Sequence, residues 1–348
     1  MFGKKFFRTA LGILLILLII LIAFQIPGLS KIVSNITELV FIPVLIAGFI
    51  YYLLRPSVRF LEIHTKSRTL AIILTLLGAI GFAAFVIYFG GNIIYTEIRK
   101  LIRFLSDYET VGQGIDNVFA QVEDFGLNLG LNLDERISAF IQRMVSFIRN
   151  YDYLGIFASI TQMAVTLLLV PFLVIYFLKD DKVLADKLIG TVPENSQNMM
   201  KEILKAVDAI FSKFIPNQLL VGIITGAITF VGYIMLGMPN PIGLAVILAV
   251  ATLIPFIGPV LGFLPALFIG MTTSLKLLLQ VAILMAIVEI FENNVIRPVL
   301  HGDKLKIHPV IVIFIILIGS FLFGVIGALF ALPVYASILE TINIVKKD

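Results

Sequence analysis

The side chains best suited to chemistry in this chain are two glutamates and an asparagine that follow a long apolar run. Glu289, Glu292 and Asn293 are spaced i, i+3 and i+4, which places them on one face of a helix. An ionised carboxylate in apolar surroundings is costly unless it is paired or binds a cation. Glu289 lies deeper in the run than Glu292, and it is our first candidate for an ion or proton site.

Two further readings of these polar residues stay open. Both glutamates could instead lie at the edge of the apolar region and pair with Arg297 or Lys304. Gln218, which follows Asn217, could orient a polar solute in a shared cavity or cap an element at an interface.

Other chemistries find little support in the residue types. The chain has no cysteine, which excludes disulfides and thiolate catalysis. No His, Asp and Glu cluster has metal-ligand spacing, and the predicted spans lack His-Glu-x-x-His and contain no Asp. We therefore expect a protein that is not an enzyme and that has no metal and no cofactor.

The composition places these residues in a membrane protein. Hydrophobic residues make up 59% of the chain and charged residues 14%, whereas a soluble domain carries about 25% charge. The net charge of +4 is small and dispersed, so nucleic acid is not an expected partner. The bilayer is.

Three spans are predicted within residues 1–91, at about 9–26, 38–54 and 69–91, each near the roughly 20 residues that cross a bilayer. We interpret the first as a retained anchor. Four cations (Arg55, Arg59, Lys66 and Arg68) lie between the second and third spans. By the positive-inside rule this segment is predicted to be a cytoplasmic loop, and the N-terminus is then cytoplasmic too.

The central part of the chain alternates between polar and apolar segments. Residues 92–153 carry a net charge of −3 and have helical apolar spacing, which predicts an extracytoplasmic amphipathic helical region. A fourth span is predicted at 154–178. Residues 179–213 read as a cytoplasmic amphipathic helix whose charges form a solvated face.

Residues 214–274 and 275–345 each combine one span with an unusually long apolar piece. The pieces 242–274 and 307–339 are both 33 residues long and without charge. That is long for one crossing and short for two. A helical hairpin that enters the membrane and leaves on the same side fits this length, although two short spans or one tilted, kinked span remain alternatives.

Both pieces carry residues that break helices. Proline removes a backbone donor, and glycine permits close approach or unusual dihedral angles. The predicted hairpin tips contain Pro255, Gly258 and Pro259 in the first piece and Gly319, Gly324 and Gly327 in the second.

With the N-terminus inside, the first hairpin enters from outside and the second from inside, which leaves the C-terminus cytoplasmic. Such an inverted repeat is typical of secondary transporters. The predicted fold is an all-α polytopic membrane protein with about six full spans plus two re-entrant hairpins in its C-terminal half.

These residues also match the pattern of a known family. The pattern consists of Gly237-Met238-Pro239, the run Leu253 to Pro259, Glu292-Asn293-Asn294, Arg297-Pro298, His308-Pro309, Gly319, Phe323-Gly324, Gly327 and Ala331-Leu332-Pro333. With these residues the chain resembles the autoinducer-2 exporter (AI-2E) family. The resemblance is strong from about residue 214 onwards and fits the whole length. Gln218 matches the family's Gly-Gln pair, whereas Pro216 and Asn217 depart from it and leave the local helix start open.

The resemblance implies a permease in a bacterial cell membrane that forms homo-oligomers. Its function is then the export of a small polar solute or signal molecule, coupled to H⁺ or Na⁺, or alternatively Na⁺(Li⁺)/H⁺ exchange. A passive channel and a membrane scaffold are the alternatives from other functional classes.

The predicted orientation can be tested by labelling. Cysteines placed at Ser67 and Glu123 of this cysteine-free chain should react with an impermeant reagent from opposite sides. Ser67 should react only from the cytoplasm, because the cations around it favour that side. Labelling of both from one side would contradict the orientation.

Overall fold

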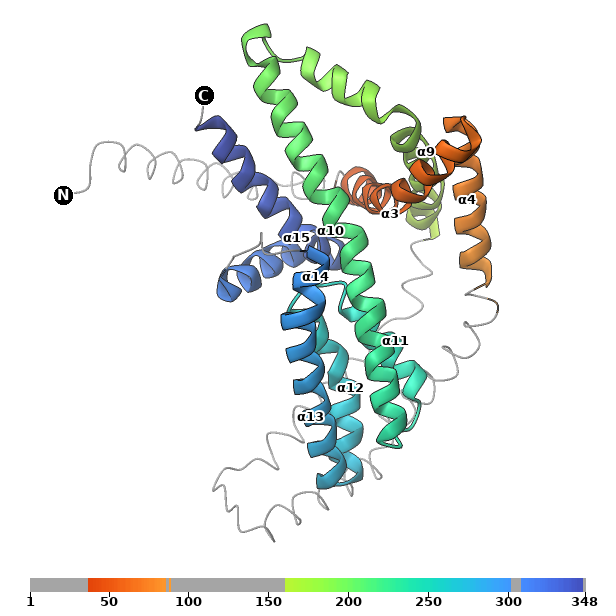
Figure 1. The fold of residues 1–348 in the computed structure, drawn as a ribbon, viewed down its shortest axis with the longest axis vertical. Coiled ribbons are helices and arrows are strands. Elements are labelled where there is room, and N and C mark those ends of the chain that lie inside the picture. Colours follow the sequence, from red (N-terminus) through yellow and green to blue (C-terminus); the bar gives the residue numbers. More distant parts are fainter. Residues whose placement is uncertain (1–36, 86–87, 89–159, 302–307, 347–348) are drawn as a thin grey trace, which may run out of the picture.

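The computed structural model describes residues 37–85, 88, 160–301 and 308–346, and Figure 1 shows their arrangement. These residues form helices joined by short turns, with no strand among them. The all-α class is thereby confirmed for this part of the chain. The predicted first span (9–26) and extracytoplasmic region (92–153) lie outside the described residues.

Helices α3 (Ile42–Thr65), α4 (Arg68–Phe85) and α9 (Ile160–Gly190) pack on one another in the N-terminal half. A π-helical turn, η1 (Thr37–Phe41), precedes α3. Their buried residues form one apolar cluster of Ala47, Tyr51, Val58, Ala71, Ile72, Val170, Val174 and Leu178. Burial of these side chains holds the three helices together.

The predicted cytoplasmic loop after the second span is wrong in its extent. α3 continues as a helix through Arg55 and Arg59 to Thr65, and only Lys66 and Ser67 separate it from α4. Lys66 takes the left-handed conformation (φ 53°), and its N–H donates to the carbonyl of Glu62, which closes the helix. Of the four cations expected in a loop, Arg55, Arg59 and Arg68 therefore lie on helices, and Lys66 lies in the turn.

Helix α10 (Glu194–Met235) connects the two halves of the molecule (Figure 1). It joins residues 194–213 of the predicted amphipathic helix (179–213) to the following span in one element of 42 residues, whereas residues 179–190 belong to α9. Pro216 lies inside it, so the departure at Pro216 and Asn217 does not mark a helix start. At 1.5 Å per residue the helix is about 60 Å long.

The first predicted break is confirmed, because the piece 242–274 folds as two helices that pack together. These are α11 (Pro241–Ala251) and α12 (Ile257–Thr273), and α12 also packs on α13 (Leu275–Phe291). Phe256 takes a positive φ (63°) in the turn between them. We call α11, the turn 252–256 and α12 hairpin 1.

The second predicted break is confirmed as well. α15 (Pro309–Val345) is interrupted at Phe323 and Gly324, and Gly324 has φ 62° and ψ −147°, a conformation that favours glycine. Gly319 and Gly327, on the two sides of the break, approach so closely that a Cβ on either would overlap the other's backbone. The two arms of α15 thus fold against each other, and we call them hairpin 2.

Four helices of the described residues are long and apolar enough to cross a bilayer: Leu39–Thr65, Arg68–Phe85, Glu194–Met235 and Val310–Val345. The last contains the break of hairpin 2. Helices α11 and α12 are apolar but shorter. The membrane character is thus supported, whereas the six spans and the re-entrant course of the hairpins remain predictions.

Candidate functional site

Glu292 is the most deeply buried acid among the described residues. Its residue surface is only 1% exposed. Thr225 of α10, itself fully buried, donates its hydroxyl to Oε2 of Glu292 at 3.0 Å. Arg297 donates to Oε1 through Nε at 3.1 Å and Nη2 at 2.5 Å. A buried carboxylate is tolerated here because both of its oxygens are satisfied and its charge is paired.

The pairing of Glu292 with Arg297 depends on an unusual backbone. The residues Glu292–Ile296 form a π-helical turn, η3, after α13, and the N–H of Arg297 donates to the carbonyl of Glu292. In an α-helix the facing neighbours are three and four residues apart, whereas this turn brings together residues five apart. Such π turns often occur at functional sites.

Arg297 also ties this turn to hairpin 1. It begins the short helix α14 (Arg297–His301), and its guanidinium lies 4.9 Å from the ring centroid of Phe256 in the turn of hairpin 1. This cation–π contact places the positive charge between Glu292 and the turn 252–256. Arg297 therefore links η3 to hairpin 1, and Thr225 of α10 joins the same site through Glu292.

Gln218 lies on the same helix as Thr225, seven residues earlier, and reaches the same hairpin. It is 1% exposed, and its Nε2 donates to the carbonyl of Thr252 at 2.6 Å. Its Oε1 is buried and has no hydrogen-bond partner among the described residues. A buried acceptor of this kind is rare and leaves one position where a donor could bind. The side-chain amide of Asn217 instead donates a hydrogen bond to the backbone carbonyl of Leu300.

The structure separates the three residues predicted to share a helix face. Glu292 is buried, Glu289 is half-buried and Asn293 is exposed. The π turn begins at Glu292 and changes the register on which that prediction depended. Glu289 forms no hydrogen bond or ion pair with any described residue, whereas Glu292 realises the alternative pairing with Arg297.

The predicted tip residues fall into two kinds. In hairpin 1, Pro255, Gly258 and Pro259 are all buried at the turn, and a Cβ on Gly258 would overlap the carbonyl of Ala251. In hairpin 2, only Gly324 lies at the break itself, where it is exposed with open space around it. Gly319 and Gly327 form the crossing point of the two arms instead.

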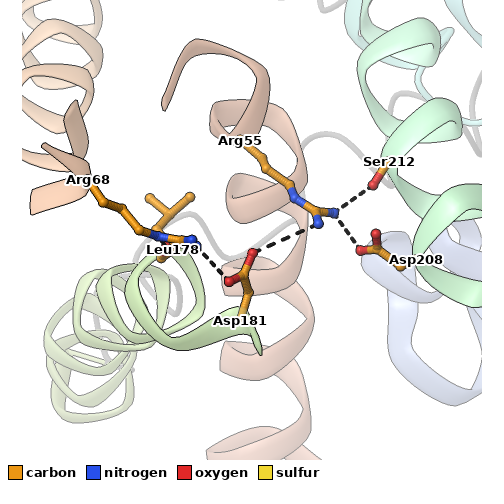
Figure 2. A network of polar contacts seen from close by, with 6 residues as sticks. All are labelled: Arg55, Arg68, Leu178, Asp181, Asp208 and Ser212. Carbon is orange, nitrogen blue, oxygen red and sulfur yellow. Dashed lines mark hydrogen bonds and ion pairs between the residues drawn. The ribbon is translucent and has the colours of Figure 1, made fainter. Parts of the chain in front are cut away.

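A second polar cluster, which the sequence reading missed, joins the N-terminal helices to α10 (Figure 2). Arg55 of α3 contacts Asp208 at 2.5 Å and Ser212 at 2.8 Å on α10, and Asp181 of α9 at 3.9 Å. Arg68 of α4 binds Asp181 at 2.6 Å and also donates to the carbonyl of Leu178. We call these four charged residues the Arg55 network. Its cations had been read as topology signals and Asp208 as part of a solvated face.

No group of three or more His, Asp or Glu side chains suited to a metal ion occurs among the described residues. The polar groups around Gln218 and Glu292 offer hydrogen bonds and charge instead. This arrangement can bind a polar solute or an ion.

Comparison with known proteins gives a consistent picture across nearly the whole chain. A family profile described as "AI-2E family transporter" matches residues 11–347. The chain is 30% identical over 354 residues to "Putative transport protein YueF" of Bacillus subtilis (strain 168), which covers 99% of this chain and 95% of that protein. It is 31% identical over 332 residues to "Putative transport protein YrrI" of the same strain, covering 93% and 91%.

A more distant relative bears a permease name. The chain is 25% identical over 315 residues to "Putative permease PerM" of Escherichia coli (strain K12), with 86% of each protein covered. Together with the long apolar helices, these matches identify a multi-pass membrane protein. The chain belongs to the AI-2E transporter family.

Proposed function

We propose that this protein is a secondary carrier that moves a small polar solute outward across the bacterial cell membrane, driven by H⁺ or Na⁺. The observation that carries the proposal is the polar cluster of Gln218, Thr225, Glu292 and Arg297. It is buried where hairpin 1 turns, within a bundle whose other buried residues are almost all apolar. Polar groups in such surroundings are expensive and are a functional site by default.

The solute class follows from the hydrogen bonds that remain open. Gln218 uses its amide nitrogen on Thr252 and leaves Oε1 without a donor. A solute hydroxyl or N–H group could supply that donor. A solute with several such groups would also find carbonyls in the turn 252–256, where the helix is broken.

Ion coupling is assigned to Glu289. A coupling carboxylate must gain and lose a cation during each cycle. Glu292 is poorly suited to this, because Thr225 and Arg297 already occupy both of its oxygens. Glu289 has no such partners among the described residues and lies one turn earlier, close to the same site.

We assign to the hairpins the movement that opens the binding site alternately to the two sides of the membrane. Both are helices broken within charge-free segments, and we propose that they enter the membrane from opposite sides as an inverted repeat, with both termini cytoplasmic. We also propose that the carrier works as a homo-oligomer in the cell membrane.

Exchange of Na⁺ or Li⁺ for H⁺ is a second candidate function. The unpaired carboxylate of Glu289 favours it, because a single acid that binds either a proton or a metal ion suffices for such exchange.

Reconstitution into proteoliposomes tests the function. A carrier should give saturable counterflow of a polar metabolite, and an exchanger should give Na⁺-dependent proton movement. Voltage-driven flux without saturation would indicate a passive channel, and no flux of either kind would leave a scaffold.

Replacing Glu289 by glutamine is expected to abolish the dependence of net transport on pH or Na⁺. Solute counterflow should persist within about twofold, because exchange without net ion movement does not need the charge to cycle. Glu340→Gln provides the matched control, since Glu340 is an exposed acid on α15. Ion dependence that is unchanged in Glu289→Gln would place the coupling site elsewhere.

A further inference from the structure

A large cavity lies between α3, α9 and α10, away from the polar cluster at hairpin 1. Its volume is about 510 Å³, and it shares no lining residue with the Gln218 and Glu292 site. Pockets for small molecules usually measure about 300–1,000 Å³. Its size is therefore that of a ligand site.

The cavity walls are mostly apolar. Aromatic rings of Tyr51, Tyr52 and Phe177 line it, together with aliphatic side chains from α9 (Leu184, Leu188 and Ile189) and from α10 (Leu204 and Val207). Leu184 and Leu188 remain about half exposed although they are leucines. Such walls suit an apolar body rather than a sugar or an ion.

The charged side chains of the cavity lining are three cations (Arg55, Lys201 and Lys205) and three anions (Asp181, Asp186 and Asp208), so the lining as a whole is neutral. The Arg55 network contributes Arg55, Asp181 and Asp208 to the lining, and with Arg68 it contains two cations and two anions that pair with one another (Figure 2). The remaining charged lining residues are Lys201, Lys205 and Asp186. Outside the ion-paired network, the lining therefore holds two lysines and one aspartate.

Lys201 and Lys205 are one helical turn apart on α10, on the same side of that helix. Both are exposed, and neither forms an ion pair with any described residue. Two free ammonium groups beside an apolar pocket suit a single carboxylate or phosphate group.

We propose that this cavity is a second ligand site, which binds an amphipathic anion. The apolar part of the ligand lies against Leu184, Leu188 and Leu204, and its carboxylate or phosphate group pairs with Lys201 and Lys205. The same chemistry is found in a free fatty-acid-like solute and in an anionic phospholipid.

The absence of tryptophan allows a direct test. Phe177→Trp places a single fluorescent reporter in the cavity wall, and Leu188→Trp places a second one at a half-exposed wall position that tolerates a larger side chain. The full-length protein is reconstituted in phosphatidylcholine nanodiscs. The probe is undecanoate brominated at its terminal carbon, because bromine quenches tryptophan on contact.

Saturable quenching by brominated undecanoate is expected for both reporters, at lower concentration than quenching by the equally brominated undecanol. The double variant Lys201→Ala/Lys205→Ala should bind the anion about fivefold more weakly, as expected for exposed charge pairs. Lys213→Ala is the matched control, since Lys213 is an exposed lysine of the same helix outside the lining. It should bind as the parent protein does.

A separate arm identifies the source of the anion. Nanodiscs that contain phosphatidylglycerol with brominated acyl chains are compared with nanodiscs that contain equally brominated phosphatidylcholine. Lysine-dependent quenching by the first lipid alone assigns the site to a membrane lipid, and quenching by free undecanoate alone assigns it to a solute. Equal affinity for undecanoate and undecanol, or binding that is unchanged without both lysines, overturns the proposal.

Discussion

Gly258→Val is expected to abolish transport. The Cβ of any residue at this position would overlap the carbonyl of Ala251, which belongs to the facing helix of hairpin 1. Backbone cannot move aside as the end of a side chain can, so α11 and α12 must separate or the turn between them must rearrange. Either change displaces Thr252 from Gln218 and Phe256 from Arg297.

Counterflow in proteoliposomes measures this effect, with membrane insertion checked by the yield of folded protein. Gly78→Val is the matched control, since a Cβ at Gly78 of α4 meets open space. Normal transport by Gly258→Val would show that hairpin 1 does not need its close packing. Gly324→Val should fail for another reason, because its positive φ strains any side chain although space is available.

Arg297→Ala is expected to be the most destabilising single charge removal in the C-terminal half. It leaves the carboxylate of Glu292 buried with only Thr225 as a partner. Breaking a buried pair in this way costs about 3–5 kcal/mol, because the remaining charge is no longer compensated. The midpoint of thermal unfolding, followed by far-ultraviolet circular dichroism in detergent, should fall clearly.

The double variant Arg297→Met/Glu292→Gln distinguishes the effect of an unpaired buried charge from the effect of lost side-chain volume. It removes both charges and keeps similar volume, so it should recover most of the stability lost in Arg297→Ala. Lys276→Ala, at an exposed cation on the neighbouring α13, should change the midpoint little. An Arg297→Ala protein as stable as the Lys276→Ala control would mean that the pair does not stabilise the fold.

The two helix breaks could be predicted from sequence because their signals are local. Each charge-free piece exceeds one crossing, and Pro255 and Gly324 lie near the middle of their pieces. Both breaks fall where the proline and glycine residues are. Whether the hairpins re-enter the membrane is a property of the bilayer around them, and it stays a prediction.

The geometry around Glu292 could not be predicted, because the helical spacing used for residues 289–293 assumes a regular α-helix and a π-helical turn begins at Glu292. Glu289 ranks above Glu292 by its position within the apolar run of the sequence. The burial of each side chain depends instead on its contacts with α10. Thr225 could have been found, since it lies seven residues after Gln218 and therefore on the same face of α10.

The Arg55 network shows a different limit. Arg55 and Asp208 are separated by 153 positions, and no pattern within a single sequence relates residues so far apart. The charge of Arg55 was visible, and the positive-inside rule gave it a plausible use. Only the packing of α3 against α10 reveals that its side chain is a partly buried ion-pair partner.

The unbroken course of α10 links the protein to the mechanics of its bilayer. The helix is about 60 Å long, roughly twice the thickness of the hydrocarbon layer. Its charged residues lie between Glu194 and Lys213, so the apolar remainder is the part that fits the lipid. A thinner or thicker bilayer changes the tilt of that remainder. Because both parts belong to one helix, a change in tilt also moves its charged end. That end is displaced most, because it lies farthest from the part in the lipid.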